Sequence, residues 1–196
     1  MTATIAEAPH ISERATNTKR FVSLDAFLKR YSDQEDGYKY EWHNGIVEKT
    51  PRTMNRDQSK IQAEILAYFY SNPTFRQLGA FLVELDMFIP TKNRTRCADM
   101  AFLTRQQMEK TGKGDVSIAP FVIEVISLND KINEFETKIK EYFANGVQVV
   151  WQIIPLSETV KVYTSVKNVT ICQGADICSA TPALPNFQMT VNDILK

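Results

Sequence analysis

Three segments in the middle of the chain decide the fold: RCADMAFLT (residues 96–104), PFVIEVIS (120–127) and NDKINEFETKIKEYFANGV (129–147). The first two are apolar runs of strand length, and each contains one carboxylate, Asp99 or Glu124. The third has apolar residues at helical spacing and contains Lys138. PFVIEVIS has the near-continuous apolar pattern of a central strand buried on both faces. We expect two neighbouring strands and the next helix to bring two acids and a lysine together.

The sequence on either side of these segments predicts further helices and strands. Helices are expected at residues 23–32, capped by Ser23, and at residues 55–72. Residues 96–104 are expected to form a short strand, and residues 105–120 a loop with room for one helical turn. Other strands are expected in a hairpin that turns at Asn44-Gly45, at 79–91, at 148–155, as an outer strand at 158–165, near 169–172, and in the tail 184–196 before a helical turn. This order favours an α/β fold, a mixed sheet flanked by helices, with an N-terminal helix and hairpin.

The helix expected at residues 55–72 carries a polar residue on its apolar side. Its expected buried stripe consists of residues at helical spacing: Ile61, Ile65, Tyr68 and Phe69. Gln58 falls on the same stripe, about 60° from Ile61. A buried polar side chain needs a hydrogen-bond partner. We therefore expect Gln58 to face a partner or a polar cavity.

The composition is that of an ordinary globular protein, with 43% hydrophobic and 23% charged residues among 196. Lys+Arg and Asp+Glu number 23 each, so the net charge is zero. This balance argues against a protein that coats nucleic acid non-specifically, although it leaves room for a local basic patch. The polar residues 1–20 are expected to be a flexible leader, and residues 21–196 a single domain.

Cysteine usage and apolar runs exclude several other classes of protein. Cys97, Cys172 and Cys178 are odd in number and lack C-x-x-C spacing, which argues against a disulfide framework or a zinc ribbon and favours the cytoplasm. No apolar run approaches the roughly 18 residues of a membrane span, so we expect no membrane partner. The N-terminus has no apolar core of the kind found in signal peptides.

Asp99 and Glu124 are the candidate metal ligands. A carboxylate in the middle of a buried strand is costly unless it is paired or holds a metal. Mg²⁺ is often bound by one or two carboxylates while it keeps several waters, and the backbone carbonyl of Val125 could add a ligand. Lys138 lies about 40° from Tyr142 on the helical wheel, at the margin of the apolar face, while Lys140 points to solvent. Metal and lysine together suit phosphodiester hydrolysis.

Alternative explanations apply to the same charged residues. Buried acids and lysines often form structural ion pairs. His10 and His43 are the only histidines, which argues against a Ser-His-Asp triad and against histidine-based zinc sites. The sequence also lacks the glycine-rich nucleotide-binding loops. Several basic residues could line a path for phosphate groups or simply form a solvated face: Lys49, Arg52, Arg56, Lys92, Arg94 and Arg96.

Taken together, the motifs resemble those of the Uma-type family of restriction-endonuclease-like proteins, within the PD-(D/E)XK nuclease superfamily. The resemblance covers about residues 21–195. Its motifs are E-x-x-x-G at Glu41, R-x-x-D ending at Asp99, E-V-x-S at Glu124, K-x-x-x-Y-x-x-x-G-V at Lys138, and a following strand tryptophan, Trp151. Each motif is weak alone, and their order makes the set specific.

The resemblance implies a Mg²⁺-dependent endonuclease that cuts DNA. Asp99 and Glu124 would then be metal ligands, and Mn²⁺ is a possible substitute for Mg²⁺. The signature lysine would be Lys138, moved from the strand position now held by Ile126, and Glu41 would be an additional acid at the site. Related folds are frequently dimeric, so a homodimer or higher homo-oligomer is expected.

The sequence departs from the family pattern at three positions, and these departures lead to two alternative hypotheses. Ala98 and Leu128 stand where the family has prolines, and Gln58 stands near the place of a frequent histidine. Glutamine cannot shuttle a proton near neutral pH. A second hypothesis is therefore a non-catalytic member of the fold that serves as a nucleic-acid or protein interaction module. A third is a structural homo-oligomer with an exposed apolar interface formed by Trp42, Phe88 and Tyr163.

Overall fold

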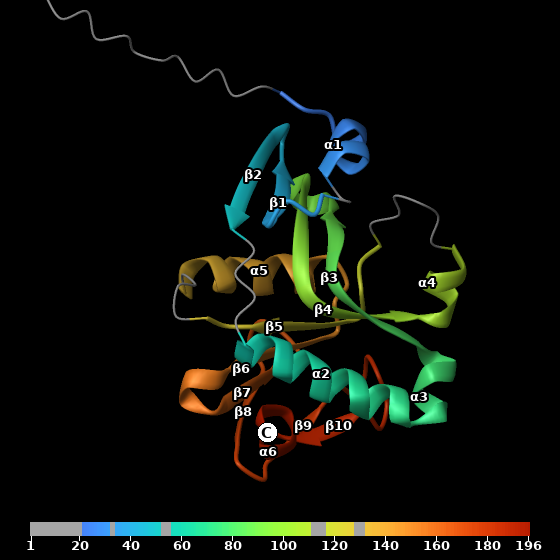
Figure 1. The fold of residues 1–196 in the computed structure, drawn as a ribbon, viewed down its shortest axis with the longest axis vertical. Coiled ribbons are helices and arrows are strands. Elements are labelled where there is room, and N and C mark those ends of the chain that lie inside the picture. The colour runs from blue at the N-terminus through green and yellow to red at the C-terminus, as the bar shows by residue number, and fades with distance from the viewer. Residues whose placement is uncertain (1–20, 32–33, 52–55, 111–116, 128–131) are drawn as a thin grey trace, which may run out of the picture.

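A computed structural model of the chain describes residues 21–31, 34–51, 56–110, 117–127 and 132–196. Within these residues the backbone forms one large mixed sheet, a separate two-stranded sheet, and helices on both faces of the large sheet (Figure 1). The expected mixed α/β sheet flanked by helices is confirmed. The leader expected at residues 1–20 and the strand-to-helix turn at 128–131 lie outside the described residues.

The large sheet has the strand order β2-β1-β4-β5-β6-β7-β8, and β3 pairs with β4 beside this path. Its strands are β1 (Tyr38–His43), β2 (Ile46–Pro51), β3 (Gly79–Ile89), β4 (Arg94–Thr104), β5 (Phe121–Val125), β6 (Val149–Ile154), β7 (Thr159–Tyr163) and β8 (Val169–Gln173). β5 and β6 are parallel, which requires a crossover. Helix α5 (Ile132–Ala144) lies in that crossover, so it starts just beyond the end of β5 that carries Glu124.

The remaining elements cover the sheet or extend it. They are α1 (Leu24–Tyr31), α2 (Arg56–Ser71), α3 (Pro73–Leu78), α4 (Arg105–Lys110), α6 (Val191–Leu195), the 3₁₀ turns η1 (Pro90–Lys92) and η2 (Pro155–Ser157), and the small sheet of β9 (Ile177–Ser179) and β10 (Gln188–Thr190). No helix in the described ranges has the length and apolarity needed to cross a membrane.

Two apolar cores lie on opposite faces of the sheet. One contains Ile65 and Phe69 of α2 together with Phe187 and other residues of the C-terminal segment. The other contains Ile139 and further residues of α5. Successive residues of β5 alternate between these cores, which confirms that PFVIEVIS is a central strand buried on both faces. Burial on both faces places Glu124 where a charge is costly without a partner.

The N-terminal helix and the hairpin that follows it form as their sequences predict. The backbone N–H of Ala26 donates to Ser23 Oγ at 3.2 Å, which caps α1. β1 and β2 pair from Tyr38–Pro51 to His43–Ile46, and the turn residues Asn44 and Gly45 have φ of 47° and 87°. Both values are positive, as a two-residue hairpin turn requires, and Asn-Gly is the pair that tolerates them best.

The structure corrects four sequence predictions. β4 is 11 residues long and begins at Arg94, where a short strand was expected. Tyr68 is 37% exposed, because it lies at the margin of the α2 stripe with its ring edge against Phe187. β7 is not an outer strand, because β8 pairs with its free side. Trp42 is only 4% exposed, so it is not part of an exposed apolar interface.

Candidate functional site

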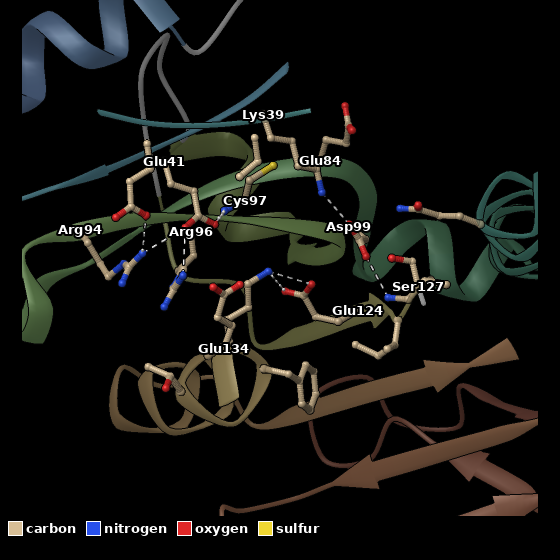
Figure 2. A pocket seen from close by; sticks show the side chains of 18 of the residues that line it. Lys39, Glu41, Glu84, Arg94, Arg96, Cys97, Asp99, Glu124, Ser127 and Glu134 are labelled. Atoms are coloured by element: carbon tan, nitrogen blue, oxygen red, sulfur yellow. Dashed lines mark hydrogen bonds and ion pairs between the residues drawn. The ribbon is translucent and has the colours of Figure 1, made fainter. Parts of the chain in front are cut away.

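A cavity of about 600 Å³ opens where the hairpin, β4, β5 and α5 meet (Figure 2). Most of its lining is charged or polar, and it contains five of the sequence-predicted site residues together with the backbone of a sixth: Glu41, Gln58, Asp99, Glu124, Lys138 and Val125. These residues come from β1, α2, β4, β5 and α5. The fold therefore brings the predicted set into one cavity, although its members are far apart in the sequence.

A break in the regular alternation of β3 and β4 lies at Asp99. The strands pair at Val83–Met100 and again at Leu85–Ala98, and the intervening Glu84 has φ of 50°. Positive φ is uncommon for a residue with a side chain and often marks functional sites.

The packing of these strands changes face at the same point. Ala98 and Ala101 both contribute to the α5-side core although they are three residues apart, and Leu82 and Leu85 behave in the same way. In a regular strand, residues three apart point to opposite faces. The irregular pairing therefore re-aims this part of the sheet, and Asp99 lies in the cavity where the faces change.

Asp99 is 6% exposed, and both oxygens of its carboxylate have partners. Oδ1 accepts a hydrogen bond from Lys39 Nζ at 2.7 Å, and Oδ2 accepts one from the backbone N–H of Val125 at 2.9 Å. The backbone carbonyl of Asp99 accepts from Gln62 Nε2 at 3.4 Å. Because Val125 follows Glu124 directly, its N–H fixes the Asp99 carboxylate next to the second acid.

Glu124 is 4% exposed and is held by two residues of α5. Tyr142 donates its hydroxyl hydrogen to Oε1 at 2.6 Å, and Lys138 Nζ lies 3.1 Å from Oε2 and 3.3 Å from Oε1. Lys138 and Tyr142 are four residues apart, so both project from the same side of the helix. Lys140 is exposed, which agrees with the expectation that Lys138 is the lysine that reaches the acids.

The surroundings of Glu124 change its proton affinity and that of its partners. Burial raises the pKa of Glu124, and the charge of Lys138 opposes that rise. Burial alone would lower the pKa of Lys138, but the carboxylates of Glu124, Glu41 and Asp99 outweigh it and raise this pKa. Burial also raises the pKa of Tyr142 well above its ordinary value, and the neighbouring Glu124 adds to the rise. At neutral pH, Lys138 is therefore an ammonium and Tyr142 a neutral hydroxyl donor.

Lys39 is a site residue that the sequence interpretation missed. It lies on β1, and Figure 2 shows its side chain directed toward Asp99. The sequence pattern that could have indicated Lys39 is K-Y-E at residues 39–41. Lys39 and Glu41 are two residues apart on one strand, so they share a face of the sheet. Nothing in the sequence indicated that this face meets Asp99, which is 60 residues away.

Glu41 lies in the cavity within a network of ion pairs. Its Oε2 accepts from Arg94 Nη2 at 3.1 Å and from Arg96 Nη1 at 2.9 Å, and Arg96 Nε also donates to Glu141 at 2.7 Å. Burial would raise the pKa of Glu41, but Lys138 and the two guanidinium groups lower it below its ordinary value. Glu41 is thus an anion at neutral pH, and its charge is already shared by two arginines.

The basic residues that could line a path for phosphate groups or form a solvated face have different surroundings in the structure. Arg94 and Arg96 line the cavity, but both bind glutamates. Lys49 pairs with Asp36 at 3.4 Å on the hairpin surface. Arg52 lies outside the described residues. The arginines therefore bind the hairpin to β4 and α5, and the cations closest to the two acids are Lys39 and Lys138.

The donor atoms at Asp99 and Glu124 fit Mg²⁺ in type. Among the residues that the structure describes, no group of three or more His, Cys, Asp or Glu side chains could hold a metal ion. A metal here would therefore rest on two carboxylates and otherwise on carbonyl, water or substrate oxygens, a common arrangement for Mg²⁺. Each carboxylate oxygen has two lone pairs, so the single hydrogen bonds to Asp99 Oδ1 and Glu124 Oε2 leave each of these oxygens a lone pair for a metal.

Comparison with known proteins finds a matching family model and similar solved structures. A family model described as "Uma2: Putative restriction endonuclease" matches residues 24–192. The chain is similar to a solved structure described as a "putative nuclease belonging to DUF820 from Anabaena variabilis ATCC 29413", with a TM-score of 0.71 and 18% sequence identity. The similarity covers 89% of this chain and 97% of that one, so the two share a fold over nearly their whole length. No curated protein matches the chain.

Proposed function

Because the chain belongs to the Uma2 family, as its motifs predict, we propose that it is a metal-dependent endonuclease that hydrolyses phosphodiester bonds in DNA. The observation that carries this proposal is the meeting of Asp99 and Glu124 in one cavity, each beside a lysine. Structural ion pairs do not require two buried carboxylates of different strands to be fixed side by side. A metal-dependent site requires its carboxylate ligands to be fixed close to each other.

Asp99 and Glu124 are the proposed ligands of Mg²⁺, with the carbonyl of Val125 as a third; Mn²⁺ also prefers such oxygen ligands. A bound divalent ion would neutralise charge on the phosphate and lower the pKa of a bound water. The protein's own contribution is to orient these ligands. The Val125 N–H holds Asp99, and the Tyr142 hydroxyl holds Glu124. Both donors come from rigid elements, which suits a site that must keep its geometry.

Lys138 is the proposed water-positioning and charge-neutralising residue. Its raised pKa keeps it protonated at neutral pH, which favours hydrogen-bond donation over proton abstraction. Gln58 lines the same cavity and supports the site as a hydrogen-bonding group, because an amide does not exchange protons near neutral pH. Glu41 is proposed to support the site through Arg96 and the charge of Lys138.

The proposal is tested by cleavage of supercoiled DNA in the presence of Mg²⁺ or Mn²⁺. Asp99→Asn and Lys138→Met should each reduce the cleavage rate about 100-fold or more, because the first removes an anionic metal ligand and the second removes the positive charge that faces the reacting phosphate. Lys140→Met is the matched control, because Lys140 is two positions from Lys138 on α5 and exposed, and it should cleave like the wild type. Full cleavage by either site variant, with folding verified by circular dichroism, would refute the assignment.

A second candidate function is a non-catalytic interaction module. It is favoured by the neutralisation of both acids by lysines and by Gln58 in place of a histidine. Thermal unfolding during titration with Mg²⁺ or Mn²⁺ separates the two functions. An increase in Tm that disappears in Asp99→Asn supports the nuclease, because only a ligand of the native state raises Tm. The absence of any response supports the module.

The proposal also includes the oligomeric state and the cellular location of the protein. Related nucleases suggested a homodimer, and light scattering of the purified protein would determine the number of subunits. The three cysteines are free and buried, which supports a location in the reducing cytoplasm.

A further inference from the structure

Lys39 binds the Asp99 oxygen that the backbone of β5 does not hold. The N–H of Val125 binds Oδ2 at 2.9 Å, so Asp99 is oriented by the main chain of β5 without help from a side chain. Lys39 Nζ binds Oδ1 at 2.7 Å. Lys39 is therefore not needed to fix the orientation of Asp99. Its ammonium instead occupies a position that a cation bound to Oδ1 would take.

The two lysines of the site are attached to their acids in different ways. Lys138 lies 3.1 and 3.3 Å from the two oxygens of Glu124, which Tyr142 also holds. Lys39 makes one short contact to a single oxygen of Asp99. The side chain of Lys39 is 21% exposed, and it comes from the hairpin, whose strand β1 pairs with β4 at His43–Arg94. Lys39 is thus the cation of the pair that can leave its acid by a side-chain rotation.

A divalent ion and an ammonium group cannot share Asp99 Oδ1 without repulsion. The charges of Lys39 and Lys138 already balance those of Asp99 and Glu124. An added ion would bring excess positive charge into a cavity where charges interact strongly. The least constrained cation would then move away from Asp99. Because Lys39 lines the same cavity, a phosphate that enters it comes within reach of the displaced ammonium, alongside the carboxylates of the lining.

We propose that Lys39 is a positioning residue that competes with the metal ion for Asp99 and, once displaced, binds a phosphate oxygen of the nucleic acid. This inference rests on the proposed function. It assigns a role to a residue outside the family motifs, and it makes metal binding and phosphate binding depend on each other. In the absence of metal, Lys39 protects the buried charge of Asp99. With metal bound, the same ammonium faces the substrate.

The first test measures Mn²⁺ affinity by isothermal titration calorimetry. Lys39→Met removes the competing charge with little change in volume, and we expect it to bind Mn²⁺ about tenfold more tightly than the wild type. Lys49→Met is the control, because Lys49 lies on the neighbouring strand β2 and pairs with Asp36, outside the cavity; its affinity should be unchanged. Lys39→Gln should behave as Lys39→Met and provides a second variant if the methionine protein fails to fold.

The second test measures DNA binding in a Lys138→Met background, where cleavage is expected to be lost. At saturating Mn²⁺, adding Lys39→Met should weaken binding to a DNA duplex, and the slope of log affinity against log salt should fall in magnitude by about 1. Without metal, the slope should not change, because Lys39 is then occupied by Asp99. A purely structural role for Lys39 would not produce a slope change that depends on metal.

The possible results separate this inference from the proposed function. Equal Mn²⁺ affinities for the wild type and both Lys39 variants overturn the competition, even where Asp99→Asn abolishes metal binding and so supports the metal site. A failure of all these proteins to bind Mn²⁺ overturns both the metal site and the role of Lys39. A metal-independent loss of DNA affinity, with no change in salt slope, would overturn the phosphate contact alone.

Discussion

At the scale of single residues, Tyr142 shows how the helix controls the buried acid. Its hydroxyl is 2.6 Å from Glu124 and lies in the interior. We predict that Tyr142→Phe lowers the free energy of unfolding by about 1–3 kcal/mol, because it removes a donor from a buried carboxylate. Urea unfolding measures the change. Tyr163→Phe, which loses a half-buried bond of 3.2 Å to the neutral Gln152, should lose less, and an equal loss in both would argue against a special role for Tyr142.

Glu41 gives a pH dependence whose sign follows from its lowered pKa. A carboxyl group whose pKa is lower in the folded protein stabilises the fold above its unfolded pKa, here 4.5, and loses that contribution as the pH falls through the folded value. We predict that Glu41→Gln lowers stability by about 3 kcal/mol at pH 7, because the buried Arg96 and the half-buried Arg94 lose an anionic partner. The difference between variant and wild type should shrink below pH 4.5.

Chemical denaturation of both proteins between pH 3.5 and 7 would test this prediction, with about four pH values needed to define the trend. A difference that stays constant across the range would show that Glu41 acts by packing rather than by its charge.

At the scale of elements, the start of β3 depends on a glycine for steric reasons. A Cβ atom at Gly79 would lie 1.9 Å from the backbone oxygen of Leu103 on β4, so one of the two strands would have to shift. We predict that Gly79→Ala lowers the free energy of unfolding by about 1–3 kcal/mol or more. Gly37→Ala is the control, because Gly37 has φ of 82° with open space around it and so isolates the backbone effect. Thermal unfolding would compare them, and a smaller loss at Gly79 would contradict the steric argument.

The predictability of the elements follows from where their signals lie. β5, α2 and α5 could be recognised because their apolar periodicity is local and matches their burial. The start of β4 could not, because Arg94 and Arg96 resemble a basic surface turn. Arg96 is buried and Arg94 half-buried because Glu41 and Glu141, from other elements, neutralise them.

The same contrast between local sequence patterns and contacts from distant elements applies to the candidate site. Asp99, Glu124 and Lys138 come from segments close in sequence, so strand order and a helical wheel were enough to associate them. Lys39 approaches Asp99 from a strand 60 residues earlier, and its pairing depends on how β1 joins β4. The irregular pairing at Glu84 has no local signal, because the positive φ falls on a residue that is neither glycine nor asparagine.

At the scale of the whole molecule, the hairpin is tied to the sheet mainly through charged side chains. β1 pairs with β4 at His43–Arg94, while Lys39 and Glu41 make ion pairs with Asp99, Arg94 and Arg96. We propose that residues 21–196 form a single domain. We therefore predict that the hairpin and the main sheet unfold in one cooperative transition.

The two tryptophans can test this prediction, because Trp42 lies in the hairpin and Trp151 in the core beside Phe187. Proteins with Trp42→Phe or Trp151→Phe each retain one fluorescent reporter. In each variant, fluorescence and far-ultraviolet circular dichroism should have the same urea midpoint. An earlier fluorescence midpoint for the protein that retains Trp42 would show that the hairpin opens independently.

The position of α5 in the crossover between β5 and β6 also determines when the site can form during synthesis. A nascent chain that ends before α5 contains Lys39, Asp99 and Glu124 but lacks Lys138 and Tyr142. Its Glu124 would have neither of the partners that stabilise its charge in the finished protein. Segments emerge from the ribosome in order, so the N-terminal hairpin must wait for later strands. Under the proposed function, the emerging polypeptide therefore acquires Lys138, the last of its proposed site residues, only when α5 has been translated.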